Sequence, residues 1–260
     1  MKHIRKKFLR ERKVNFDPDK FRASVTLNDD DIASGYKVME SETHYPVILT
    51  TQNELIQGFL YKTPDRRFVI PEPNLITVYF DIAQSQINLL FPAKLDLLRN
   101  IESSADLSTT LNNTHTFFHH SCICIMFMHN SLEAFINLLL PIDKVYVKEG
   151  DKNTSHYNHE QIQKNISLEE KIKSVIPQFT NKSFHTSYGH KYETLLKLKA
   201  LRDEIAHTKA HAENDNPNYY KQIFTSLLDF DYNMAIHCVR DFINYYQPSL
   251  VEECNCGRKE

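Results

Sequence analysis

The segment from Thr116 to Leu140 constrains the fold of this chain more than any other. Its apolar residues recur at spacings of three, four and seven, the periodicity of an amphipathic α-helix. Pro141 is expected to end this helix, because proline cannot continue it. The apolar stripe consists of Phe118, Cys122, Ile125, Leu132, Ile136 and Leu139. A helix of this length needs other helices to cover its apolar face, so we expect a mainly α-helical chain.

Several other segments show helical periodicity. Residues 190–209 carry a second apolar stripe, and it should pack on the first one; it consists of Leu195, Leu198, Leu201 and Ile205. The remaining predicted helices are Leu75–Leu90, Ala93–Ser103 after the break at Pro92, a short helix opened by a capping box at Ser167 and ending before Pro177, and residues 218–246. The Ser/Thr/Asn-rich residues 103–115 and the polar residues 142–166 are predicted loops. The pattern indicates an up-and-down helical bundle.

The first 73 residues differ from the rest and indicate a small mixed α/β appendage. Phe59–Tyr61 and Phe68–Ile70 flank a turn, which predicts a hairpin. Tyr36–Met39 and Tyr45–Thr50 also have a strand-like composition. The first 13 residues contain seven Lys and Arg and one acid, Glu11. This basic arm is either a solvated end or a tail that binds RNA or a protein. We therefore divide the chain into an appendage (1–73), a helical bundle (74–250) and a polar tail (251–260).

Composition excludes several classes of protein. The net charge of −2 gives no overall basic field for coating nucleic acid or an anionic membrane, and five glycines without a cluster exclude a phosphate-binding loop. The longest apolar run contains His129 and Glu133, which are costly in lipid, so we expect no membrane span. Cys254 and Cys256 lack the partners for a tetrahedral zinc site. Without a secretory signal, the expectation is a soluble cytoplasmic protein with no metal or cofactor.

Arg202 is the residue that most needs a partner. It lies about 40° from the centre of the leucine stripe of 190–209, so its guanidinium should be partly buried and paired. Adjacent residues on a helix do not face each other, so Asp203 is not the expected partner. On the 116–140 helix, His129, Glu133 and Asn137 border the apolar stripe at every fourth position. They are either solvated border residues or groups that orient Arg202, with Glu133 first and Asn137 second.

His207 lies five residues after Arg202. On a straight helix it would point about 140° away and lie roughly 7.5 Å further along the axis. The two side chains could then not act on one phosphate, unless the helix ends near His207 or a second chain completes the site. We therefore expect a symmetric dimer in which the two segments around Arg202 and His207 face one another.

The segment Arg202-Asp203-Glu204-Ile205-Ala206-His207 resembles the Arg-x4–6-His motif of the HEPN superfamily (higher eukaryotes and prokaryotes nucleotide-binding). Members often carry a polar residue directly after the arginine, as Asp203 does here. A preceding long helix containing Ser131–Asn137 and a further helix after the motif are similar to the family arrangement. The resemblance covers residues 75–250 and implies a HEPN-like bundle.

The resemblance implies metal-independent cleavage of RNA. His207 would act as general acid or base on the ribose hydroxyl or the leaving oxygen, because imidazole titrates near neutral pH. Arg202 would bind the phosphate, and Asp203 would support the arginine. Family members commonly act as homodimers, in some cases with a regulatory protein partner, and many are toxins or antiviral defence effectors.

Two alternatives stay open at this point. One is a HEPN-like bundle without catalysis, serving as an RNA-binding or protein-interaction module. The other is an unrelated helical protein, in which Arg202 belongs to a structural ion pair and His207 is a surface residue. An active site requires both side chains to be accessible in one groove, so their surroundings distinguish these readings.

Overall fold

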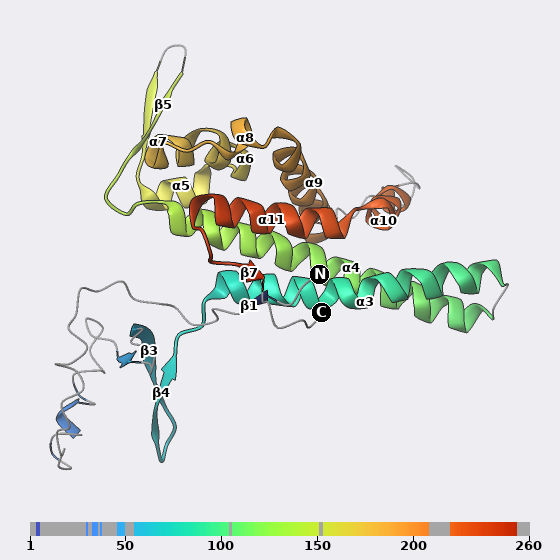
Figure 1. Cartoon of the computed structure of the whole chain (residues 1–260), viewed down its shortest axis with the longest axis horizontal. Helices are drawn as coiled ribbons and strands as arrows, with labels where there is room; N and C mark the ends of the chain where they lie inside the picture. The colour runs from blue at the N-terminus through green and yellow to red at the C-terminus, as the bar shows by residue number, and fades with distance from the viewer. Residues whose placement is uncertain are drawn as a thin grey trace. The chain divides into compact units, whose positions relative to one another are not determined.

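The computed structural model describes residues 4–5, 30, 33–35, 37, 46–49, 55–103, 106–150, 153–207 and 219–253. The chain divides into two compact units, residues 7–74 and residues 1–6 with 75–260. The larger unit is built mainly of helices, so the predicted mainly α-helical class is confirmed (Figure 1).

The smaller unit contains a three-stranded antiparallel sheet in the order β2 (Val47–Leu49), β3 (Leu55–Lys62) and β4 (Arg67–Pro71). β3 and β4 form the predicted hairpin, with Lys62 opposite Arg67. β2 lies within the second predicted strand segment. Of the first segment, 36–39, only Lys37 lies among the described residues, and it is helical. Except for Ile4 and Arg5, the basic arm lies outside the described residues.

Two long helices form the framework of the larger unit. α3 (Leu75–Glu102) and α4 (Leu107–Leu139) lie side by side as an antiparallel hairpin (Figure 1). The predicted break at Pro92 is wrong. The Pro92 ring is exposed, and so is Asn88, whose carbonyl has no N–H to accept from at position 92. The buried residues on either side of Pro92 pack on α4, so the helix continues through it.

The predicted loop at 103–115 is also mostly wrong. α4 begins at Leu107, where the carboxylate of Asp106 accepts a hydrogen bond from the backbone N–H of Thr109. Further along, the hydroxyls of Thr114 and Thr116 donate to the carbonyls four residues earlier. Polar side chains that usually favour loops are thus absorbed into the helix once α3 supplies a packing surface.

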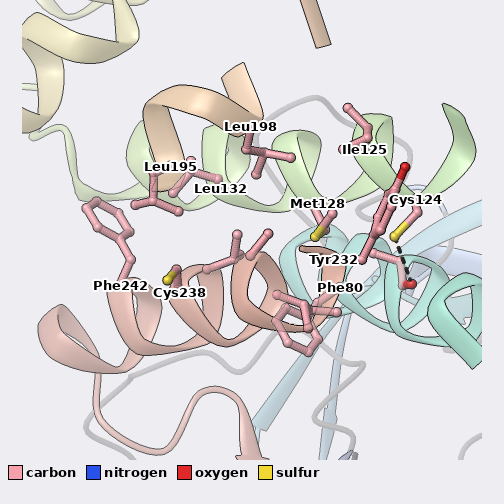
Figure 2. Close-up of a cluster of buried hydrophobic side chains, with 14 of the residues drawn as sticks. Phe80, Cys124, Ile125, Met128, Leu132, Leu195, Leu198, Tyr232, Cys238 and Phe242 are labelled. Carbon is pink, nitrogen blue, oxygen red and sulfur yellow. Dashed lines mark hydrogen bonds between the residues drawn. The ribbon is translucent and has the colours of Figure 1, made fainter. Parts of the chain in front are cut away.

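The core lies where α9 (Gly189–Ala206) and α11 (Tyr232–Tyr246) pack on α4. Leu132, Leu195 and Leu198 share one apolar core, and Figure 2 shows them approaching one another from α4 and α9. The predicted packing of these two helices is therefore confirmed. The predicted single helix over 218–246 is wrong, because Asp231 caps a new helix after α10 (Tyr219–Asp229).

A second, smaller core lies beyond the C-terminal end of α4. It consists of Leu140, Tyr146, Ile162, Ile166 and Val175. The predicted loop at 142–166 is wrong, since this core orders a hairpin of β5 (Tyr146–Glu149) and β6 (Thr154–Tyr157), followed by α5 (His159–Asn165).

The chain then continues through α6 (Leu168–Glu170), a π-helical turn η1 (Lys171–Val175) and α7 (Ile176–Thr180). Ser167 caps α6 as predicted, with its hydroxyl accepting from Glu170 N–H, but the helical run does not stop before Pro177. The N–H of Ile176 bonds to Lys171 O, the wider π-type spacing, and Pro177 follows in the first turn of α7. The four-residue α8 (Phe184–Ser187) leads into α9.

The ends of the larger unit meet in a short pairing. β1 (Ile4–Arg5) is antiparallel to β7 (Glu252–Glu253), and Arg5 lies opposite Glu252. Val251, which the sequence placed in the polar tail, is buried in the core. Its backbone N–H and C=O both bond to the side-chain amide of Asn244. The tail therefore begins after this residue.

Among the residues that the structure describes, α4 is the one helix long and apolar enough to cross a membrane. Forty-four per cent of its most apolar window is buried inside the protein. This is the helix on which α3, α9 and α11 pack, and its buried apolar residues between Phe117 and Ile136 have partners within the chain.

Candidate functional site

Arg202 lies just before the last turn of α9, on the side facing α4. Leu195, Leu198 and Leu201 are buried and fix this helix in the core. The Arg202 side chain extends from the border of that apolar face and is 21% exposed. Its position agrees with the partial burial expected from the sequence.

The closest cross-helix partner of Arg202 is His129 of α4, which is completely buried. Arg202 Nε lies 3.2 Å from His129 Nδ1, and Arg202 Nη2 lies 3.0 Å from His129 Nε2. A neutral imidazole has one acceptor nitrogen, so only one of these two contacts can be a hydrogen bond donated by the guanidinium. The sequence identified the correct helix and named His129 as a border residue, but it ranked Glu133 as the partner.

His129 is uncharged at neutral pH. Burial lowers its pKa to about 4, and the positive charge of Arg202 acts in the same direction. The imidazole can therefore hold the guanidinium in place without adding a charge of its own.

Asp203 is a second partner of Arg202, which corrects the expectation that neighbouring residues cannot pair. Arg202 Nη1 lies 2.9 Å from Asp203 Oδ1. The long arginine side chain bends back along the helix, so its tip reaches a carboxylate that its Cβ does not face. Asp203 also forms an ion pair with Lys199 one turn earlier. Partial burial raises the pKa of Asp203, but Lys199 and Arg202 outweigh it and lower this pKa overall.

Glu133 lies near both Arg202 and the neutral His129. Its Oε2 lies 4.0 Å from Arg202 Nη2, at the outer limit of an ion pair, and 3.7 Å from His129 Nδ1. Its negative charge also favours the protonated form of Lys171, a buried side chain of the π-helical turn whose Nζ donates to Gln163 O at 3.0 Å. Burial is the larger influence and lowers the pKa of Lys171.

Asn137 does not join Arg202. Its buried Oδ1 has no hydrogen-bond partner among the residues that the structure describes. Lys171 was missed by the sequence analysis. A lysine on the inward side of the predicted helix after Ser167 was the available signal, but nothing in the sequence placed it near Glu133.

His207 lies just beyond the helical part of α9. α9 ends at Ala206, and His207 leaves helical geometry with φ −119° and ψ 47°, while its backbone N–H still bonds to Asp203 O. The residue is exposed. The helix therefore ends near His207, which was the first of the two conditions named for joint action with Arg202.

Two open grooves are lined by described residues elsewhere. One, of about 610 Å³, lies beside β5 and includes Lys148 and Glu170; the other, of about 500 Å³, lies at the end of α11 and includes Arg240 and Asp241. Neither groove is lined by Arg202 or His207. Within the described ranges, no three His, Cys, Asp or Glu side chains are grouped as a metal site would require. Cys254 and Cys256 lie outside these ranges.

The C-terminal end of α9 thus carries a held guanidinium, that of Arg202, and an exposed residue, His207. Arg202 can bind an anion with the part of its guanidinium that is exposed. No protein-family model matches the chain, and no curated protein and no solved structure match it either.

Proposed function

We propose that this chain is a metal-independent endoribonuclease of the HEPN type. His207 serves as general acid or base, Arg202 binds the scissile phosphate, and Asp203 with His129 orients the arginine. The observation that carries the proposal is the end of α9 at Ala206, which leaves His207 exposed at the C-terminal end of the helix that bears Arg202. The contact of Arg202 with the buried His129, which holds the guanidinium from α4, adds support.

The wider setting of this proposal follows the family resemblance. RNA is the ligand, the chain works in the cytoplasm as a homodimer, and a regulatory protein partner controls it, as in toxins and antiviral defence effectors. The dimer with the two motif segments facing one another stays a prediction from the sequence.

A ribonuclease assay with EDTA present tests the proposal. The substrate is a mixture of unstructured and structured RNA, and the variants are His207→Ala and Arg202→Lys. Loss of a general acid or base typically slows a reaction about 10²–10⁴-fold, and we expect that range for His207→Ala. Arg202→Lys keeps the charge but loses the planar fork that binds a phosphate through two hydrogen bonds, so it should also be impaired.

The matched control is His190→Ala. His190 is an exposed histidine in the first turn of the same helix, so its loss changes composition but not the motif. It should cleave as the wild type does. Cleavage that persists in purified His207→Ala at the wild-type rate would sink the proposal.

One observation favours a second function, that of a non-catalytic HEPN-like RNA-binding or interaction module. Arg202 Nε and Nη2 lie against His129, and Nη1 lies against Asp203, so protein groups already occupy much of the guanidinium. In that case the wild type would cleave no RNA. It would still bind labelled RNA in fluorescence anisotropy, and Arg202→Met would weaken this binding.

A further inference from the structure

We propose that the outer half of the α3–α4 hairpin is the docking surface for a second copy of this chain. The surface, here called the outer hairpin face, consists of Phe91, Leu95, Leu98, Ile101, Leu107 and Leu111. All six side chains are exposed, by between 37% for Leu95 and 73% for Leu107. Six large apolar side chains in one short region of surface indicate an interaction site rather than a solvated helix pair.

The exposed residues continue a helical pattern. On α3, Phe91, Leu95 and Leu98 follow spacings of four and three, and they lie about 130° around the helix from the buried residues that pack on α4. On α4, Leu107 and Leu111 are one turn apart, about 100° from the side that packs on α3. Because the two helices run antiparallel, the exposed residues of α3 and those of α4 lie on the same side of the hairpin.

Contacts with α10 independently show that this side of the hairpin accepts another helix. Lys94, one turn inward from Leu98, donates a hydrogen bond from Nζ to Leu228 O near the end of α10. Phe118, two turns inward from Leu111, meets Phe224 of α10 with ring centroids 4.6 Å apart. α10 therefore covers the inner part of this face by contacting both helices. Further out, the hairpin extends past the other helices of the larger unit (Figure 1), and the face is exposed.

A second copy is the occupant that fits the size and the charges. The stripe from Phe91 to Ile101 is about 15 Å long, and half-exposed side chains of this size would remove roughly 500–600 Å² of surface per chain. Two chains would bury on the order of 1,100 Å², which exceeds the roughly 1,000 Å² that a biological interface needs and is typical of a weak dimer. Two antiparallel copies pair the stripe with itself about a twofold axis, as symmetric dimers do.

Charged residues beside the stripe favour a protein partner over a lipid surface. Asp96, Arg99 and Glu102 are exposed on the same stretch of α3, and Asp106 lies at the turn. Acids outnumber the single arginine, so an anionic bilayer would repel this end. In an antiparallel pair centred on the stripe, Arg99 of one copy lies about one turn from the level of the partner's Asp96, which gives each side one pair of opposite charges.

This interface takes the place of the predicted one between motif segments, which would leave the double hairpin variant dimeric. None of the exposed large apolar side chains among the described residues comes from α9, so that helix offers little apolar area for association. The two interfaces can be separated by variants. Leu98→Glu with Leu111→Glu disrupts the outer hairpin face, while Glu204→Lys changes the exposed motif segment and leaves the hairpin intact.

Sedimentation velocity of the full chain, at about 1–100 µM, tests the proposal. We expect a dimer for the wild type and for Glu204→Lys, and a monomer for the double hairpin variant. Leu138→Glu is the matched control, since Leu138 is an exposed leucine at the other end of α4 and should leave the dimer unchanged. Circular dichroism checks that each variant is folded, and the pair Phe91→Lys and Leu95→Lys repeats the test at different positions.

Three results would overturn the proposal. One is a wild type that stays monomeric at the highest concentration. Another is a dimer that persists in both hairpin variants. The same conclusion would follow if Glu204→Lys dissociated the dimer and the hairpin variants did not. The third is flotation of the wild type with phosphatidylcholine vesicles that depends on Leu98 and Leu111, which would assign the face to lipid. Each readout is independent of ribonuclease activity.

Discussion

The two halves of α4 belong to one helix but have opposite surroundings. None of residues 107–116 in the outer half is buried. The inner half, in contrast, buries ten residues between Phe117 and Ile136 on more than one face, including the polar Ser121, His129 and Ser131. α3 packs along the helix, while α9 and α11 also cover the inner half.

The difference shows how burial extends the partners that a polar residue of α4 can reach. In the outer half, threonine hydroxyls donate to the carbonyls of their own helix. In the inner half, the hydroxyl of Ser121 does the same at Phe117 O, but Ser131 Oγ donates to Ile76 O of α3 and His129 contacts Arg202 of α9. Buried polar groups need such partners, because an unpaired one is costly. The candidate site and the outer hairpin face thus lie in the two opposite environments of one helix.

The largest expected contrast comes from truncating one apolar residue in each half. Phe135 is fully buried and its ring meets Phe242 edge-on, so Phe135→Ala should lower the free energy of unfolding by about 3–5 kcal/mol. Leu107→Ala, in the outer half, should change it by no more than about 0.5 kcal/mol. Urea unfolding followed by circular dichroism, in protein dilute enough to be monomeric, measures both. Similar losses for the two variants would remove the distinction between the halves.

The second expected effect is an acid destabilisation that originates in the inner half. The pKa of His129 falls from its ordinary 6.5 to about 4 in the folded protein. Above pH 6.5 the imidazole is neutral in both states. Between pH 6.5 and 4 the unfolded chain binds a proton that the folded chain does not, so the free energy of unfolding should fall by about 3 kcal/mol as pH drops.

His129→Gln keeps a neutral hydrogen-bond acceptor but does not titrate, so it should flatten this slope. Denaturant unfolding at a series of pH values measures the slope. His115→Gln, an exposed position in the outer half, controls for the general loss of one histidine. Parallel slopes for the wild type and His129→Gln would contradict the assignment of the effect to His129.

The smallest contrast concerns hydroxyl groups. Ser131→Ala leaves the Ile76 carbonyl without its 2.8 Å hydrogen bond in a buried setting, which should cost about 1 kcal/mol. Thr116→Ala removes a bond within the exposed outer half and should be neutral or slightly stabilising, since alanine favours helix. Equal effects of the two variants on the thermal unfolding midpoint would show that the hydrogen bond from Ser131 to the Ile76 carbonyl does not stabilise the protein.

Part of the candidate site could be predicted from the sequence. Helical spacing placed Arg202 at the border of the leucine stripe and directed it toward the 116–140 helix, and both are confirmed. The choice of His129 over Glu133 could not be predicted, because both lie on the same border one turn apart. It depends on the axial offset between α4 and α9, which no local pattern encodes.

The errors in the fold have one source. Local residue preferences predicted a helix break at Pro92 and loops at 103–115 and 142–166. In each place, packing on a neighbouring element gives a helix or strands instead. Local preferences amount to at most a few kcal/mol, while burial against a second element contributes a comparable or larger amount. α10 and α11 show the reverse case, since one capping aspartate, Asp231, divides a periodic apolar pattern that reads as a single helix.

The sequence by itself determined the mainly helical class, the two apolar stripes that form the core and the isolation of Arg202 as a charge in need of partners. These follow from periodicity and from the cost of burying a charge, which act within a single helix. Only the tertiary structure decided that His129 holds Arg202, that α9 ends at Ala206 next to an exposed His207, and that the side chains of the outer hairpin face are exposed. These depend on where one helix ends along another, and that position is set by packing the whole core at once.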